Sequence, residues 1–142
     1  MVTGAWFCAS FTKVRKVKDV SRVILTRRVL NVTRGETLAR DAAVAETVRE
    51  RVRGLIGRDR LKPGEALILP RCRQVHSFGM RFPIDVVFID GKGRVAMTRT
   101  GLEPRRISSV AWRARCAVEL AAGTLYETGT VKGDIISFLD RD

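Results

Sequence analysis

The sequence predicts a mainly β fold, at the border of the α+β class, in which about eight short strands form a barrel or sandwich with one short flanking helix. Two observations indicate it. Short runs rich in β-branched and aromatic residues recur at close spacing, separated by Gly, Pro and charged residues. Only one segment has the three- and four-residue apolar periodicity of a helix. The regular strand-helix alternation of a doubly wound sheet is absent, which excludes that class.

Eight strands are expected. They lie at residues 20–32, 38–44, 65–70, 71–78, 84–89, 94–100, 116–120 and 135–139. The helix is expected between the second and third strands, where five apolar residues share one face: Val44, Val48, Val52, Leu55 and Ile56. Gly54 and Gly57 favour its end. A hairpin turn is expected at Asp90 to Gly93, and a helical turn at residues 121–127.

The composition is that of one folded domain. The chain has 142 residues, of which 45% are apolar and 30% charged, unlike the few apolar residues and high charge of disordered chains. A chain of this length buries roughly two thirds of the surface that its unfolded form exposes. We expect a single monomeric domain at residues 20–142, preceded by a basic N-terminal arm at residues 1–19 of the kind that is commonly flexible.

The chain is strongly basic. Its formal net charge is +12, from 27 Lys plus Arg against 15 Asp plus Glu, and such a balance favours contact with polyanions. The excess is concentrated before Pro63, but no run exceeds two adjacent cations, and Trp112 is the only candidate stacking residue in a basic setting. Two interpretations follow: a solvated Arg-rich surface, or weak, nonspecific electrostatic contact with nucleic acid.

The three cysteines, Cys8, Cys72 and Cys116, are far apart and form no Cys-x-x-Cys pair. We therefore expect reduced, buried thiols rather than a disulfide framework or a zinc knuckle. No segment reaches the length of a membrane span. The apolar run at residues 5–11 is short for a signal peptide and lacks a preceding basic cluster. The expectation is a cytoplasmic protein without membrane contact.

The stretch from Val75 to Asp90 (VHSFGMRFPIDVVFID) contains the only histidine, His76, and places Asp85 inside an apolar run. The run at residues 84–89 is typical of a central strand covered on both faces. A charge there is costly unless it has a partner. This conflict between charge and burial makes the stretch the first candidate for a functional site.

His76 and Asp85 are candidate catalytic residues. If the strands on either side of residues 79–83 pair, a carboxylate beside the imidazole would fix its tautomer and raise its pKa, which suits general acid-base chemistry. Exact pairing about Arg81 instead puts Asp85 opposite Ser77, on the other face from His76, so the contact depends on register. The alternative is structural: Asp85 accepts backbone N–H bonds from the turn and His76 is a hydrogen-bonded core or rim residue.

A set of three possible metal ligands and one further carboxylate are also candidates. Cys72, His76 and Met80 are possible ligands for soft metals, but strand residues four apart stand about 13 Å from each other, so no metal and no cofactor are expected. Glu119 lies in an apolar strand as Asp85 does. It is either a second polar group of a pocket or the outward face of an edge strand.

Four separated blocks resemble the DUF192 family, also called UPF0127. They are RGLIGR from Arg53, HSFGMRFPIDVVFID from His76, VELAAG from Val118 and KGD from Lys132. The resemblance covers residues 20–139 and implies a compact, mostly β domain with one flanking helix. It implies little chemistry, because the family is uncharacterised. Many relatives carry a Trp-Met-Lys-Asn type block where this chain has Phe78-Gly79-Met80-Arg81.

The leading hypothesis is a small β domain with a ligand pocket near the HSFGMRFPID segment, because polar groups inside an apolar segment are typical of ligand sites. The candidate binding residues are His76, Phe78, Met80, Arg81 and Asp85. Two alternatives stay open: a hydrolase or isomerase that uses the His76 and Asp85 pair, and electrostatic nucleic-acid binding by the Arg-rich surface.

Overall fold

The computed structural model describes residues 5–6 and 26–140. Eight strands form one sheet in the order β1-β8-β2-β3-β4-β7-β5-β6. The strands are β1 Ala5–Trp6, β2 Thr26–Asn31, β3 Glu36–Val44, β4 Glu65–Pro70, β5 Ile84–Asp90, β6 Val95–Leu102, β7 Ala114–Ala121 and β8 Ile136–Asp140. The helices are α1 Val48–Arg53 and α2 Thr124–Thr128. The predicted mainly β fold is confirmed, and the predicted helical turn is the second helix.

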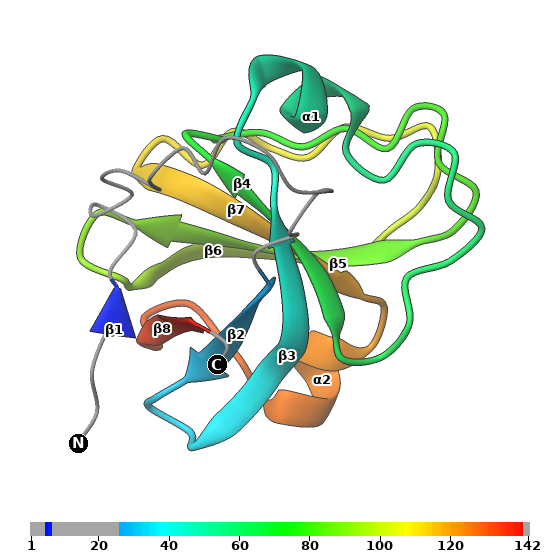
Figure 1. Cartoon of the computed structure of the whole chain (residues 1–142). Helices are drawn as coiled ribbons and strands as arrows, with labels where there is room; N and C mark the ends of the chain where they lie inside the picture. Colours follow the sequence, from blue (N-terminus) through cyan, green and yellow to red (C-terminus); the bar gives the residue numbers. More distant parts are fainter. Residues whose placement is uncertain (1–4, 7–25, 141–142) are drawn as a thin grey trace, which may run out of the picture.

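The sheet curls into a half-barrel (Figure 1). All its strand pairs are antiparallel except β3 with β4, which are joined by the segment that contains α1. The start of β6 reaches the residues that precede β8, where Arg94 and Ile135 form an isolated bridge. The N–H of Val95 donates to the carbonyl of Asp134 at 2.8 Å, and that of Ile136 donates to Gly93 at 2.8 Å. These bonds close the sheet at one end.

Strand β5 is buried on both faces, as its apolar run predicts. Val87 and Ile89 pack in the cluster that also contains Phe138 of β8. Val86 and Phe88 point to the other side, into a second cluster with Leu55 and Met80 from the segments around α1. Alternate residues of a strand face opposite sides of a sheet. The same rule applies to β7, whose Ala117 belongs to the second cluster, so the side chain of Glu119 faces the α1 side.

The strand predicted at residues 71–78 is wrong. The segment leaves the sheet at Arg71, which takes a φ of 56° directly after β4, a conformation that ends an extended strand. Its polar backbone groups bond to residues 105–111 instead, and His76 forms an isolated bridge with Ile107. Strand β5 therefore pairs with β6 and β7 rather than with this segment.

The helix is shorter than its apolar pattern predicts. The hydroxyl of Thr47 accepts from the N–H of Glu50 at 3.0 Å, and the Glu50 carboxylate accepts from the N–H of Thr47 at 3.0 Å. This capping box fixes the start of α1. Gly54, with a φ of 49°, ends the helix. Of the arm predicted at residues 1–19, only Ala5–Trp6 is described, and it pairs with β8; the remainder lies outside the described residues.

Candidate functional site

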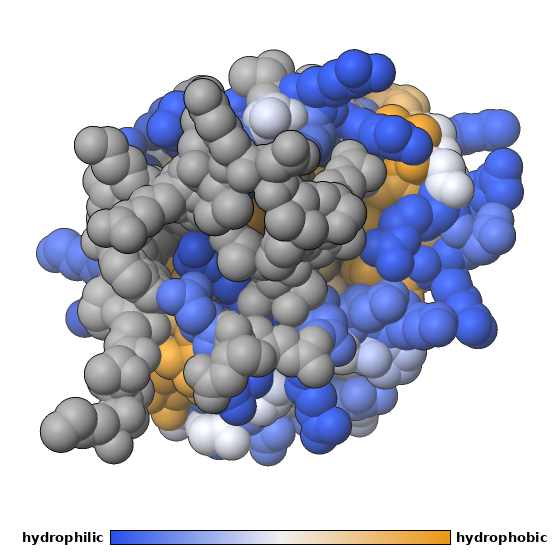
Figure 2. Space-filling view, in the orientation of Figure 1, coloured by the Kyte–Doolittle hydropathy of each residue, from blue (hydrophilic) through white to orange (hydrophobic). Residues whose placement is uncertain are grey.

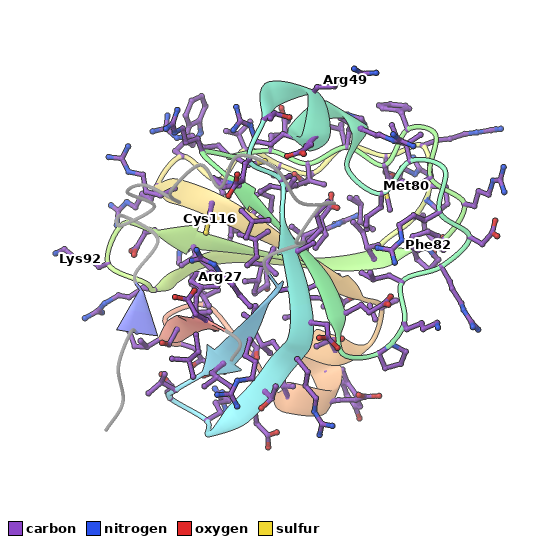
Figure 3. All side chains as sticks on the ribbon, viewed as in Figure 1. Arg27, Arg49, Met80, Phe82, Lys92 and Cys116 are labelled. Carbon is purple, nitrogen blue, oxygen red and sulfur yellow. The ribbon has the colours of Figure 1, made fainter. Side chains whose placement is uncertain are left out.

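The candidate site lies at the α1 end of the half-barrel. The segments that converge there are α1 with the turn after it, the loop at residues 71–83, and the loop at residues 103–113 (Figure 1). Gly79 of the first loop lies against Ile56, since a Cβ on Gly79 would stand 3.4 Å from that side chain. In Figure 3 Met80 lies below α1, and Phe82 continues the same side of the molecule. Strand β7 forms the floor of this region.

Glu119 occupies the middle of β7. Its neighbours across the sheet are Leu67 of β4 and Val86 of β5, so it belongs to an interior strand. The interpretation of Glu119 as the outward face of an edge strand is therefore wrong. The residue is only 3% exposed, and its Oε2 accepts no hydrogen bond from any described residue. A buried carboxyl oxygen without a protein partner is rare and marks a strained or functional position.

Burial controls the protonation of Glu119. Removal of the carboxyl from water disfavours its charged form, which raises the pKa of Glu119 to about 8. At neutral pH the side chain is thus mainly a neutral carboxylic acid. In that form it can donate one O–H bond and still accept others. The site offers both functions in one apolar setting.

A cavity of about 50 Å³ opens in front of Glu119. Its polar lining consists of side chains from three segments: Arg51 and Arg53 of α1, Cys72, Gln74 and His76 of the following loop, and Glu119 of β7. The remaining lining is Gly54 together with apolar Leu55, Ile56, Leu69, Val75 and Met80. Gly54 borders the carboxyl closely, because a Cβ added there would lie 3.8 Å from Glu119 Oε2.

Cys72 is a free, half-buried thiol in this wall. Burial raises the pKa of the Cys72 thiol, and the charge of Glu119 acts in the same direction. The Sγ–H donates to the carbonyl of Gln74 at 3.1 Å. Nucleophilic cysteines have a lowered pKa instead, so Cys72 is held as a thiol that shapes the wall. Cys116 corrects the expectation of three reduced thiols, because it is disulfide-bonded.

The structure brings two of the five predicted binding residues to the cavity. His76 and Met80 line it, and the exposed His76 ring lies 5.8 Å from the ring of Phe78. Phe78 is 53% exposed and does not contribute to the lining. Arg81 is also outside it and pairs with Asp59 at 2.7 Å, where both side chains are exposed. An exposed ion pair of this kind contributes little to stability.

Asp85 serves the fold. Its Oδ1 accepts from the N–H of Gly101 at 2.9 Å, and its Oδ2 accepts from Gly123 at 3.1 Å and Leu125 at 3.0 Å. The structural interpretation of Asp85 as an acceptor of backbone N–H bonds is confirmed, although the donors belong to β6 and to the start of α2 rather than to residues 79–83. The predicted contact between His76 and Asp85 does not form, because the two residues lie on segments that do not pair.

Across residues 5–6 and 26–140, no group of three or more His, Cys, Asp and Glu side chains is arranged to hold a metal ion. The two helices described are too short to cross a membrane. The site therefore consists of the cavity, its carboxyl group and the surrounding cations.

Comparisons with known proteins identify the fold. The model of the DUF192 family, described as Uncharacterized ACR, matches residues 29–138. A solved structure from Sinorhizobium meliloti 1021, provisionally named a transcription regulator, is 21% identical with a TM-score of 0.72 and covers 85% of this chain and 98% of its own. A protein of unknown function from Novosphingobium aromaticivorans DSM 12444 is 19% identical with a TM-score of 0.69, covering 91% and 94%. No protein with a curated description matches the chain.

Proposed function

The chain belongs to the DUF192 family of uncharacterised proteins, and from the geometry of its site we propose that it binds a small polar ligand in front of Glu119. One observation carries the proposal. A nearly fully buried carboxyl on an interior strand has an oxygen without a hydrogen-bond partner among the described residues, at the wall of a cavity. An unsatisfied buried group costs about 1–3 kcal/mol. A ligand that bonds Oε2 would remove that cost, so the site favours occupancy.

The size of the cavity limits the ligand. At about 50 Å³ it is far smaller than the roughly 300–1,000 Å³ of pockets that hold drug-sized molecules. It suits a group of a few heavy atoms, either a very small molecule or one end of a longer one. Leu55, Leu69 and Met80 supply apolar contacts to a short aliphatic part.

The polar lining favours ligands that accept hydrogen bonds. The protonated Glu119 donates an O–H, and Arg51 and Arg53 supply guanidinium donors. Guanidinium groups match carboxylates geometrically. The net charge of +12 also attracts anions. We infer that the ligand carries a small carboxylate or a comparable carbonyl group.

Binding is better supported than catalysis by the same residues. The Cys72 thiol has a raised pKa, which does not suit a nucleophile. The oxygens of Asp85 accept three backbone N–H bonds, which leaves the carboxylate poorly placed to orient His76. A hydrolase or isomerase that uses His76 and Asp85 is therefore the weaker candidate.

Chemical shift mapping tests the proposal. Formate, acetate and propionate are titrated into the wild-type protein at pH 6.5, and saturable shifts are expected at Gly54, Met80 and Glu119. Glu119→Gln keeps a neutral hydrogen-bonding group and should retain binding. Glu119→Leu should lose it at least tenfold while remaining folded, because an apolar group of similar size replaces the carboxyl. Wild-type spectra in which no acid produces saturable shifts at these residues would reject a carboxylate site.

A further inference from the structure

A second feature lies beside the cavity: an arginine ribbon made of the loops at residues 71–83 and 103–113. The two loops are joined by backbone hydrogen bonds along their length (Figure 1). The N–H of Ala111 donates to Arg73 at 2.8 Å, that of Ser108 to Val75 at 2.8 Å, and that of Ser77 to Arg106 at 2.8 Å. The hydroxyls of Ser77 and Ser108 add bonds between the loops. The ribbon is therefore an ordered surface, built without regular strands.

The ribbon concentrates positive charge. Its six arginines are all exposed: Arg71, Arg73, Arg81, Arg105, Arg106 and Arg113. Its single acidic residue is Glu103, so the two loops carry a net charge of +5 out of the chain's +12. Among the described residues only Arg81 of this set makes an ion pair. Arg73 Nε donates to the carbonyl of Ala114 at 3.3 Å, and the other four guanidinium groups make no ion pair with a described residue and can meet an anionic partner.

Exposed planar and apolar side chains are interleaved with these arginines. Trp112 is 75% exposed, Ile107 57% and Phe78 53%, and the exposed His76 ring lies beside Phe78. Figure 2 shows apolar residues exposed to the right of α1 on a mainly hydrophilic face. An exposed tryptophan presents a large ring face that a partner can contact. Unstacked nucleobases stack on aromatic rings that lie among cations.

The backbone of the ribbon is strained at two arginines. Arg71 and Arg105 have φ values of 56° and 63°, and no other non-glycine residue among those described has a positive φ. Such conformations cost of order 1 kcal/mol or more and cluster at ligand sites. Both positions carry a cation to the surface. The two strained backbone positions therefore both present a cation at the surface.

We propose that the arginine ribbon binds single-stranded nucleic acid, with phosphates held by the arginines and bases stacked on Trp112 and on the His76–Phe78 pair. A duplex keeps its bases stacked on one another, so it would leave these rings unused. An anionic membrane attracts Lys and Arg equally, whereas the ribbon uses arginine alone, the cation that binds phosphate in a bidentate manner and stacks. The ribbon shares Cys72, Gln74, Val75, His76 and Met80 with the cavity, but Trp112 and its six arginines lie outside the cavity lining.

Fluorescence anisotropy with labelled 12-nucleotide dT and U oligomers at 50 mM salt tests the inference. Trp112→Ala should raise Kd at least fivefold, Trp112→Phe should stay within twofold, and Arg105→Ala with Arg106→Ala should raise Kd about tenfold. The matched control combines Arg40→Ala with Lys132→Ala, two exposed cations outside the ribbon. It removes the same charge and should change Kd less than twofold.

Further measurements separate the other partners. The slope of log Kd against log salt should fall by about 1.4 when two phosphate contacts are removed. Equal losses in the ribbon and control variants would show attraction by net charge alone and overturn the site. Equal or tighter binding of a 12-base-pair duplex, or of phosphatidylglycerol vesicles with a blue shift of Trp112 emission, would also overturn it. The small-carboxylate titration is independent, because Trp112→Ala leaves the cavity intact.

Discussion

The Oδ2 atom of Asp85 accepts the backbone N–H of Leu125 at 3.0 Å, so a buried carboxylate of β5 holds the first turn of α2. Oδ2 also accepts from Gly123, and Oδ1 accepts from Gly101 at the end of β6. One side chain thus satisfies three N–H groups from two connections. Backbone donors at a helix start need such partners when the chain buries them.

Asp85→Ala should therefore destabilise the protein severely. It would leave three backbone donors without their acceptor, and we expect a loss of about 3–5 kcal/mol in the free energy of unfolding. Urea unfolding followed by circular dichroism measures it. Asp59→Ala is the control, because it removes an exposed carboxylate and should change stability by less than about 0.5 kcal/mol. Comparable losses in both variants would show that Asp85 has no special structural role.

Asp134, whose carbonyl helps to close the half-barrel, is expected to make the free energy of unfolding depend on pH in the acid range. Burial alone would raise the pKa of Asp134, but hydrogen bonds from Arg34 and Asn31 outweigh it and lower the pKa. A lowered pKa contributes stability above the unfolded value, near 4, and this contribution is lost as pH falls through the folded value. Asp134→Asn should therefore cost about 1–3 kcal/mol at pH 7.

Urea unfolding of wild type and Asp134→Asn at pH 7 and at pH 3 checks this prediction. The difference between the two proteins should shrink at pH 3, because the unfolded carboxyl then takes up a proton that the folded carboxylate, with its lowered pKa, resists. Because the carbonyl of Asp134 accepts from Val95 of β6, hydrogen exchange at Val95 should accelerate in the variant. A difference that stays constant between the two pH values would contradict the assignment.

Much of the fold could be predicted from local pattern. The run at residues 84–89 reports its burial directly, and Pro63–Gly64 and Asp90 to Gly93 mark turns that the structure contains. The prediction of a strand at residues 71–78 is wrong. The backbone of this segment does form hydrogen bonds, but with the loop at residues 103–113 and not with a strand of the sheet. Composition does not reveal the positive φ at Arg71 that turns the chain out of the sheet.

The site was harder to predict than the fold. Asp85 is a candidate because it is a charge in an apolar run. Glu119 lies in an apolar run in the same way (residues 116–120, CAVEL), and its Oε2 has no hydrogen-bond partner among the described residues. What separates them is the identity of their neighbours in space. Three backbone N–H groups donate to Asp85. Glu119 is instead bordered by Gly54, at the end of α1, and by the loop at residues 71–83. Strand order decides this, and it is not local in sequence.

Gly54→Ala should both destabilise the protein and impair the cavity. Gly54 has φ 49° and ψ −125°, a combination that residues with a Cβ rarely adopt, so a loss of about 1–3 kcal/mol is expected. The new Cβ would stand 3.8 Å from Glu119 Oε2 and would narrow the space for a ligand. Thermal unfolding and acetate titration measure the two effects. Gly64→Ala, at φ 89° with no atom near its Cβ, controls for strain and should leave binding unchanged.

Glu119 should make stability fall as pH rises. Its folded pKa is raised to about 8, while the unfolded value is near 4.3. Between these values the folded state holds a proton that the unfolded state has released, so folding is favoured at low pH. The contribution is fully present below about pH 4 and is lost as pH rises through 8, with a slope of about 1.4 kcal/mol per pH unit in between.

Glu119→Gln removes the titrating group while keeping its shape and its hydrogen-bonding capacity. The stability difference between wild type and this variant, measured by urea unfolding from pH 5 to pH 8, should therefore change in favour of the variant as pH rises. The difference isolates Glu119 from the other groups that titrate in this range. A carboxylate ligand that requires the protonated form should bind more weakly as pH rises through about 8. A flat difference would mean that Glu119 is ionised at neutral pH, and the donor role assigned to it would then be wrong.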